Sequence, residues 1–173
     1  MVDRPSGTVT FLFTDIEGST RRWEEEPDAM QMALAAHDEV LRAAIEARRG
    51  WLFKHTGDGA YAAFASARAA VEAAIDAQRA LELPVRMGIA TGEAERRGDD
   101  YFGPPLNRAA RVMGAGHGGQ ILAASSTVAL IEGFELVDLG PRRLRDLSEP
   151  LQLFQVCADG LRPSAKHARH CPR

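Results

Sequence analysis

An almost uninterrupted apolar run near the start of the chain does most to limit the possible fold. The run is VTFLFTDI, residues 9–16 of 173, and it is rich in β-branched and aromatic side chains. Such a run suits a strand that is buried on both faces, and it ends next to a carboxylate, Asp15. We therefore expect this segment to be a central strand of a sheet.

The patterns that follow alternate between helices and strands. Helices are predicted at 18–49, interrupted near its start by Pro27, at 66–83 with Ser66 as N-cap, and at 104–113. Strands are predicted at 51–56, 60–65, 85–91, 120–124, 134–139 and 151–156, whereas 92–103 is expected to be irregular. Trp23 and Trp51 are expected to pack in the core. Strands and helices with interleaved hairpins favour an α+β fold with a mixed or antiparallel sheet over a doubly wound parallel one.

Composition excludes several other classes of protein. A length of 173 residues suits one domain, and a formal charge of −3 gives no reason to expect nucleic acid as a partner. The sequence has no run long and apolar enough for a membrane span, and Met1 to Gly7 lacks the apolar core of a secretory signal. We expect a cytoplasmic protein with a domain over 1–159 and a disordered basic tail over 160–173.

The residues around Asp15 suggest a phosphate and metal site. Asp15 closes the first strand, and Gly18, Ser19 and Thr20 follow at the predicted start of a helix. Backbone N–H groups at a helix start favour phosphate oxygens, and a strand-end carboxylate can hold a magnesium ion. The alternative is that Asp15 is only a cap before a helix, which is the commoner role for an aspartate there.

Asp58 is a candidate for a second carboxylate at the same place. It lies in the turn Gly57-Asp58-Gly59 between two predicted strands. If these strands lie beside the first one, two aspartates could bind two metal ions for an in-line phosphoryl displacement. The spacing alone favours the simpler interpretation, because Gly-Asp-Gly suits a hairpin turn in any protein.

Two further features point to a ligand. Asn107 and Arg111 lie four residues apart on a predicted helix and share one face, where they could orient a ribose and bind phosphate oxygens. The alternative is a solvated polar stripe. Only two of the 21 basic residues are lysine, so Lys54 stands against the composition, although a chance lysine remains an open alternative.

Three motifs in order resemble the class III adenylyl and guanylyl cyclases: FTDIEGST, FKHTGDG and DYFGPPLNRAAR. The chain is most similar to small single-domain bacterial members of mycobacterial type, and the resemblance extends from Val9 to Val156. It implies a ferredoxin-like or palm-like sheet flanked by helices. It also implies a head-to-tail homodimer, in which each active site is completed by both subunits.

The resemblance also implies roles for individual residues. Asp15 and Asp58, together with Ile16, match the positions that bind two divalent metal ions, Mg²⁺ or Mn²⁺. Lys54 and Asp100 match the pair that recognises adenine. Asn107 and Arg111 match the residues that position the ribose and stabilise the transition state, and Arg145 matches a basic residue that contacts the triphosphate.

The function implied is an adenylate cyclase, which converts ATP to 3′,5′-cyclic AMP and pyrophosphate. Adenine presents an acceptor at N1 to Lys54 and an amino donor at N6 to Asp100, and guanine inverts both groups. Two alternatives stay open: a catalytically silent nucleotide-binding module and a guanylate cyclase. Diguanylate synthesis is disfavoured, because the Gly-Gly-Asp/Glu-Glu-Phe hairpin that it needs is absent from the sequence.

Overall fold

A mixed sheet forms the centre of the protein in the computed structural model, which describes residues 4–161. Its strands are β1 (Gly7–Ile16), β2 (Trp51–Thr56), β3 (Gly59–Phe64), β4 (Val85–Arg97), β5 (Asp100–Phe102), β6 (Ile121–Ala124), β7 (Glu135–Arg142) and β8 (Leu151–Cys157). Seven of them follow the order β2-β3-β1-β4-β6-β8-β7, and β5 pairs with the end of β4. Only β4 and β6 pair in parallel, so the mixed sheet expected from the sequence is confirmed.

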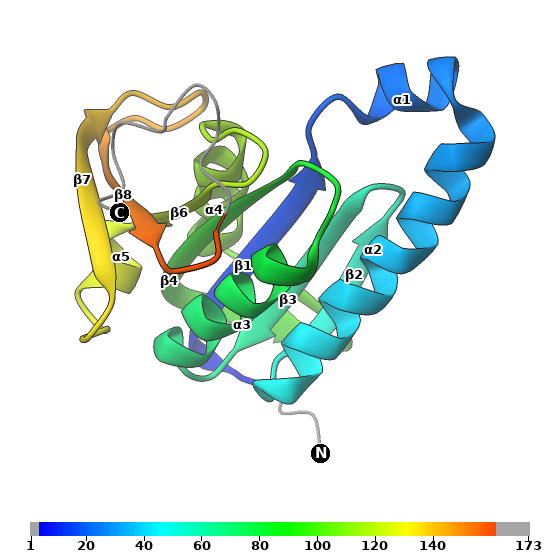
Figure 1. Ribbon diagram of the computed structural model, residues 1–173. Helices are drawn as coiled ribbons and strands as arrows, with labels where there is room; N and C mark the ends of the chain where they lie inside the picture. Colours follow the sequence, from blue (N-terminus) through cyan, green and yellow to red (C-terminus); the bar gives the residue numbers. More distant parts are fainter. Residues whose placement is uncertain (1–3, 162–173) are drawn as a thin grey trace.

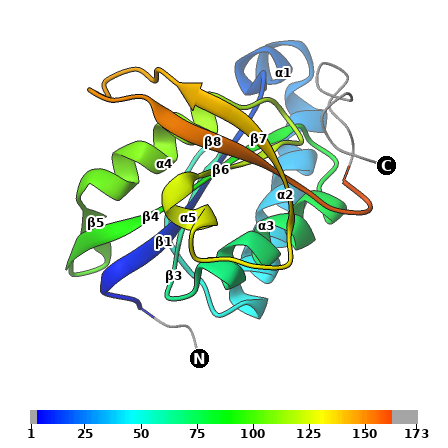
Figure 2. The same cartoon turned by 90° about the vertical axis from the view of Figure 1, so that its left-hand side faces the viewer.

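Helices cover both faces of this sheet. They are α1 (Ser19–Glu25), α2 (Pro27–Ala47), α3 (Ala67–Ala80), α4 (Pro104–Gly114) and α5 (Ser125–Val128). Figure 1 shows α2 and α3 in front of the sheet, and the turned view of Figure 2 shows α4 on the opposite side. Pro27 occupies the first turn of α2, where its missing N–H costs nothing, and it separates α2 from α1. Within residues 4–161 no helix is long and apolar enough to cross a membrane.

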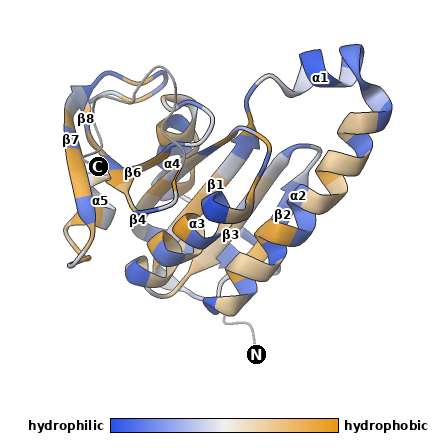
Figure 3. Cartoon of the chain, in the orientation of Figure 1, coloured by the Kyte–Doolittle hydropathy of each residue, from blue (hydrophilic) through white to orange (hydrophobic). Residues whose placement is uncertain are grey.

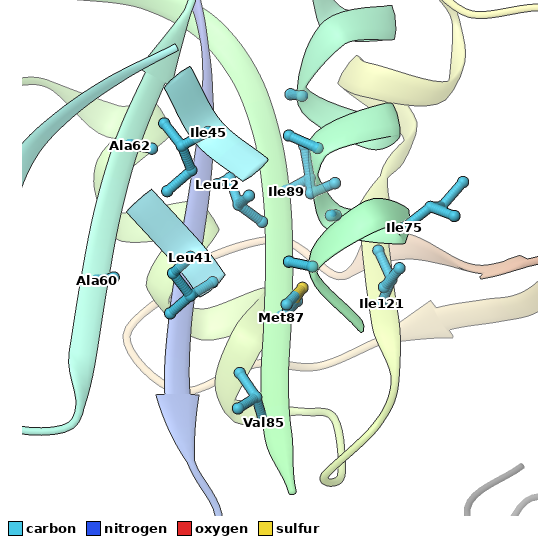
Figure 4. Close-up of a cluster of buried hydrophobic side chains, with 14 of the residues drawn as sticks. Leu12, Leu41, Ile45, Ala60, Ala62, Ile75, Val85, Met87, Ile89 and Ile121 are labelled. Atoms are coloured by element: carbon cyan, nitrogen blue, oxygen red, sulfur yellow. The ribbon is translucent and has the colours of Figure 1, made fainter. Parts of the chain in front are cut away.

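Strand β1 is the central strand that its apolar run predicts. Phe11 and Phe13 contribute to the core under α4, whereas Leu12 and Ile16 contribute to the core under α2 and α3. This alternation follows from the two-residue period of a strand. Figure 4 shows Leu12 in the second of these cores, between Leu41 and Ile45 of α2 and Met87 and Ile89 of β4.

The helix expected at 18–49 is two helices, and only the second one packs as predicted. Met30, Leu41 and Ile45 of α2 are buried, but no residue of α1 is, and Trp23 is 39% exposed. Figure 3 shows the hydrophilic α1 projecting away from the sheet. The prediction that Trp23 lies in the core is therefore wrong, because the break at Pro27 directs α1 away from the body of the protein.

The segment expected to be irregular, 92–103, is instead largely extended. β4 continues to Arg97, and Gly98 and Asp99 turn the chain into β5, so that Arg97 pairs with Asp100. The polar composition misled the prediction because this part of the strand is mostly exposed to solvent. The disordered tail predicted for 160–173 lies, from residue 162 onward, outside the described residues.

Candidate active site

Asp15 lies near the end of β1, directly opposite Arg86 in the neighbouring strand β4. Arg86 forms a bidentate pair with the Asp15 carboxylate: Nε donates to Oδ1 at 2.6 Å and Nη2 donates to Oδ2 at 2.5 Å. These hydrogen bonds raise the pKa of Arg86. No sequence motif includes Arg86, since its place beside Asp15 depends on the register between two strands 71 residues apart.

Asp58 lies in the turn between β2 and β3, as expected. Its Oδ2 accepts a hydrogen bond of 2.8 Å from Ser19 Oγ in the first turn of α1. The register between β1 and β3 pairs Thr14 with Ala60, which places Asp15 beside the turn that carries Asp58. The charges of Asp15, Glu17 and Asp58 all help to raise the pKa of Arg86. The structure thus brings Asp15, Asp58 and Ser19 together.

The carboxylates of Asp15 and Asp58 are of the chemical type that binds Mg²⁺. Among residues 4–161 no group of three or more His, Cys, Asp or Glu side chains forms a ready-made metal cage. Mg²⁺ typically keeps several waters and binds through one or two carboxylates plus the phosphates of a nucleotide. Asp15 and Asp58 supply two such carboxylates. Without an ion, the positive charge of Arg86 compensates the negative charge of Asp15.

The other residues proposed around this turn differ in what they can offer. The side chain of Ile16 is buried in the core, so only its main-chain carbonyl could face an ion. Gly18 precedes α1 in the left-handed conformation, at φ +72°, which glycine adopts without strain. Thr20 is exposed and makes no side-chain hydrogen bond within the described chain.

Glu17 ties this turn to the connection between α4 and β6. Its Oε2 accepts a hydrogen bond of 2.8 Å from the main-chain N–H of Gly118, and Oε1 lies 3.4 Å from Nδ1 of His117. The bond from Gly118 is the main cause that lowers the pKa of Glu17. Neither contact was expected from the sequence, where His117 has no obvious partner.

Lys54 and Asp100 meet at a separate cavity. Lys54 Nζ, on β2, lies 3.8 Å from Asp100 Oδ2 at the start of β5, and both side chains are about half exposed. The cavity beside them has a volume of about 300 Å³. Most of its wall is apolar and includes Phe13, Phe53, Tyr61, Leu106 and Ala110. An apolar cavity whose lining includes one cation and one carboxylate suits a heteroaromatic base.

An aromatic cluster fixes the two strands that carry this pair. The rings of Phe53 and Tyr101, which neighbour Lys54 and Asp100 in sequence, pack edge to face with centroids 5.0 Å apart. The hydroxyl of Tyr101 donates to the main-chain oxygen of Pro5 at 2.6 Å, and burial raises the pKa of Tyr101. The strands that carry Lys54 and Asp100 are therefore packed together by aromatic side chains.

Asn107 and Arg111 share a face of α4, but their surroundings differ. The side chain of Asn107 is exposed and makes no hydrogen bond within residues 4–161. Arg111 Nη2 donates to Asp146 Oδ2 at 2.5 Å. Arg145 is 83% exposed, and its Nε lies 3.8 Å from the same carboxylate oxygen. Arg145 therefore lies near Arg111 through Asp146.

The position of α4 depends on a close approach to β4. A side chain at Gly88 would overlap the main-chain nitrogen and Cα of Met113, so glycine is required where the helix crosses the strand. This crossing sets where Asn107 and Arg111 lie relative to the sheet.

The six residues with expected catalytic roles thus form three groups in one chain. Asp15 lies near the turn with Asp58, Lys54 pairs with Asp100, and Asn107 lies with Arg111 on α4. Among the described residues no hydrogen bond or ion pair joins the Lys54–Asp100 pair to Asp15 or Asp58.

Known proteins resemble the chain in sequence over most of its length, although no family model matches it. An uncharacterised protein of Mycobacterium tuberculosis is 37% identical over 180 residues, which cover 97% of this chain and 63% of that protein. A receptor-type adenylate cyclase of Trypanosoma congolense is 31% identical over 87% of this chain and 28% of its own length. The chain therefore spans less than two thirds of the length of these curated relatives.

Solved structures resemble it in fold. An adenylate cyclase of Trypanosoma brucei, solved in its monomeric state, superposes with a TM-score of 0.83 and 28% identity over 89% of both chains. The adenylyl cyclase CyaB of P. aeruginosa gives a TM-score of 0.78 and 25% identity over 88% of this chain and 94% of CyaB. A guanylate cyclase domain of Catenaria anguillulae in complex with GTP gives 0.77 at 20% identity, over 90% and 99%, and shows the fold alone. With this fold and these relatives, the chain belongs to the class III adenylyl/guanylyl cyclase domain family.

Proposed function

We propose that the chain is an adenylate cyclase that converts ATP to 3′,5′-cyclic AMP and pyrophosphate. The observation that carries this proposal is the Lys54–Asp100 pair, 3.8 Å apart beside an apolar cavity. Lys54 can donate to N1 of adenine, and Asp100 can accept from its N6 amino group. Guanine would face both groups with the wrong hydrogen-bonding pattern, which leaves polar atoms unpaired and disfavours GTP.

Asp15, Asp58 and the main-chain carbonyl of Ile16 would hold two divalent metal ions, Mg²⁺ or Mn²⁺. Bound there, such ions would activate the ribose 3′-hydroxyl and neutralise the triphosphate. Arg86 already lies against these carboxylates, so it must share or yield Asp15 when an ion binds. Gly18, Ser19 and Thr20 start α1 beside this site, where main-chain N–H groups favour phosphate oxygens.

In the reaction, the ribose 3′-oxygen forms a bond to the α-phosphorus, the bond from that phosphorus to the bridging oxygen breaks, and pyrophosphate leaves. The proton of the hydroxyl passes to water. Asn107 orients the ribose, and Arg111 donates to the oxygens of the α-phosphate, where negative charge accumulates. Arg145 contacts the triphosphate.

Two subunits complete each site in this proposal. Asp15 and Asp58 of one subunit face Lys54, Asp100, Asn107 and Arg111 of its partner, so a two-fold homodimer has two equivalent sites. The separation of these residues into groups within one chain supports this arrangement. The cytoplasmic location expected from the sequence stays a prediction.

The test is product analysis by chromatography. The purified chain is incubated with ATP or GTP and with Mg²⁺ or Mn²⁺, over a range of protein concentrations. We expect metal-dependent cyclic AMP and a specific activity that rises as dimers form. Asp15→Asn and Asp58→Asn should abolish turnover, and Asp99→Asn, a matched change in an exposed ion pair with Arg4, should leave it intact. A failure to form any cyclic product under all conditions would refute the proposal.

A further inference from the structure

The connection between β7 and β8 places one carboxylate beside the arginine of α4. Asp146 Oδ2 accepts a hydrogen bond of 2.5 Å from Arg111 Nη2, and the two residues are 35 positions apart in sequence. The same oxygen lies 3.8 Å from Arg145 Nε. Asp146 therefore stands between the two arginines that the proposed function assigns to the phosphates of ATP.

The backbone of Asp146 is unusual. Its φ is +62°, and among the described residues only Arg49 is another non-glycine residue with a positive φ. A side chain costs free energy in this conformation, and Asp and Asn tolerate it better than most residues do. A strained conformation of this kind persists only where the surrounding structure supports it, and it is enriched at functional sites.

The contact leaves much of the guanidinium available. Asp146 engages only Nη2, and no hydrogen bond within residues 4–161 engages Nη1. Nε of Arg111 is buried without a partner, and about a third of the side chain is exposed. One end of Arg111 is therefore held by packing and by Asp146, while donors remain for a phosphate.

We propose that Asp146 is a positioning residue that orients Arg111 toward the α-phosphate. This inference rests on the proposed function, because it assumes that Arg111 acts on the transition state. A preoriented guanidinium needs no reorganisation when charge develops, so its loss lowers kcat more than it raises KM. The contrary role, a carboxylate that competes with ATP for Arg111, would make its removal lower KM and raise activity.

Two substitutions distinguish the effect of the Asp146 carboxylate from the effect of its backbone conformation. Asp146→Gly removes the side chain and relaxes the positive φ, and Asp146→Asn keeps the conformation and one oxygen acceptor but removes the charge. For Asp146→Gly we expect kcat to fall roughly ten- to a hundredfold with KM for ATP within about twofold of the original chain. The kcat of Asp146→Asn should lie between that of Asp146→Gly and that of the original chain. The thermal unfolding midpoint should not drop in either variant.

A second measurement reports on Arg111 without using activity. Phenylglyoxal modifies arginine side chains, and peptide mass spectrometry gives the rate at each one. Arg111 should react several times faster in Asp146→Gly than in the original chain, whereas Arg108, exposed on the same helix, should react at the same rate in both.

The outcomes distinguish the two proposals. An unchanged kcat in Asp146→Gly, or a lower KM with higher activity, overturns the positioning role while the adenylate cyclase function stands. An unchanged rate of Arg111 modification overturns the ion pair itself. An original chain that forms no cyclic product overturns the proposed function and the catalytic role of Asp146 together, whatever the modification rates are.

Discussion

Arg86 and Asp15 face each other across β4 and β1, and the arginine fork occupies both oxygens of the carboxylate. Asp15, the aspartate that would bind a metal ion, is therefore already paired with a cation of the chain itself. Binding of an ion and binding of Arg86 to Asp15 are competing events, and this competition can be measured.

Removal of that cation should change stability and metal binding in opposite directions. Arg86→Met leaves both oxygens of the Asp15 carboxylate without their partner, which should destabilise the metal-free protein by about 1–3 kcal/mol. Added Mn²⁺ should then raise the unfolding midpoint more in the variant than in the original chain, since the ion no longer competes with a guanidinium. Thermal unfolding with and without Mn²⁺ measures both effects. Arg86→Met with Asp15→Asn is the control, and an equal Mn²⁺ shift in all three proteins would contradict the competition.

Base selectivity should follow the Lys54–Asp100 pair. Lys54→Glu places an acceptor opposite N1–H of guanine, and Asp100→Asn places a donor opposite O6. The double variant should lower the ratio of kcat/KM for ATP to that for GTP by about 10- to 100-fold. Steady-state kinetics with both nucleotides measure the ratio, and Asp99→Asn controls for a nearby change of charge. An unchanged ratio would remove both residues from base recognition.

Shared active sites predict that two inactive variants restore each other. Asp58→Asn and Asn107→Ala damage opposite halves of each site, so a mixed dimer has one intact site and one doubly damaged site. After subunit exchange, an equal mixture should regain about a quarter of the original activity. A mixture of Asp15→Asn with Asp58→Asn should stay inactive, because every mixed site then lacks one aspartate. Recovery in both mixtures, or in neither, argues against this division of residues.

The crossing of α4 over β4 predicts a large effect from one methyl group. Gly88→Ala forces the main chain of Met113 away from the sheet, which should cost about 1–3 kcal/mol or more and shift Asn107 and Arg111. Gly114→Ala is the matched control, since a side chain there meets nothing within 4 Å and a helical alanine is favourable. The free energy of unfolding, measured in urea, and the turnover rate should both fall for Gly88→Ala. Neither quantity should fall for Gly114→Ala. Equal behaviour of the two variants would mean that α4 tolerates displacement.

The contact between Glu17 and Gly118 predicts a dependence of stability on pH. The hydrogen bond from the Gly118 N–H lowers the pKa of Glu17 below its ordinary value of 4.5. A carboxylate with a lowered pKa contributes stability above the unfolded pKa and loses it as the pH falls through the folded pKa. Glu17→Gln should therefore be less stable than the original chain at neutral pH, and the difference should shrink as the pH falls below 4.5. Urea unfolding across this range measures it, and a constant difference would assign the effect to packing.

Much of the fold was accessible from local patterns. A few neighbouring residues suffice to predict each of three features: the apolar run of β1, the hairpin around Asp58 and the glycine-rich end of α4. The extension of β4 to Arg97 was not accessible, because its exposed half resembles a loop in composition. Trp23 was misplaced for a related reason: spacing alone cannot show that α1 has no surface to pack against.

The candidate site divides in the same way. Lys54 and Asp100, 46 positions apart, were paired only through a family resemblance, and the structure brings them to 3.8 Å. Arg86 and Asp146 were not foreseen, since each owes its role to strand register or loop geometry and not to a motif. The roles of Asp15, Asp58, Asn107 and Arg111 in catalysis remain predictions for the experiments above.

A single strand connects the two ends of this chemistry. β4 carries Arg86 at its second residue, opposite Asp15, and its last residue, Arg97, pairs with Asp100. Side chains alternate between the two faces along the exposed half of β4, so this half sets the register in which β5 presents Asp100 to Lys54. Removal of one residue from it would reverse that alternation, whereas removal of two would preserve it. The part of β4 that resembles a loop in composition therefore determines whether Asp100 meets Lys54.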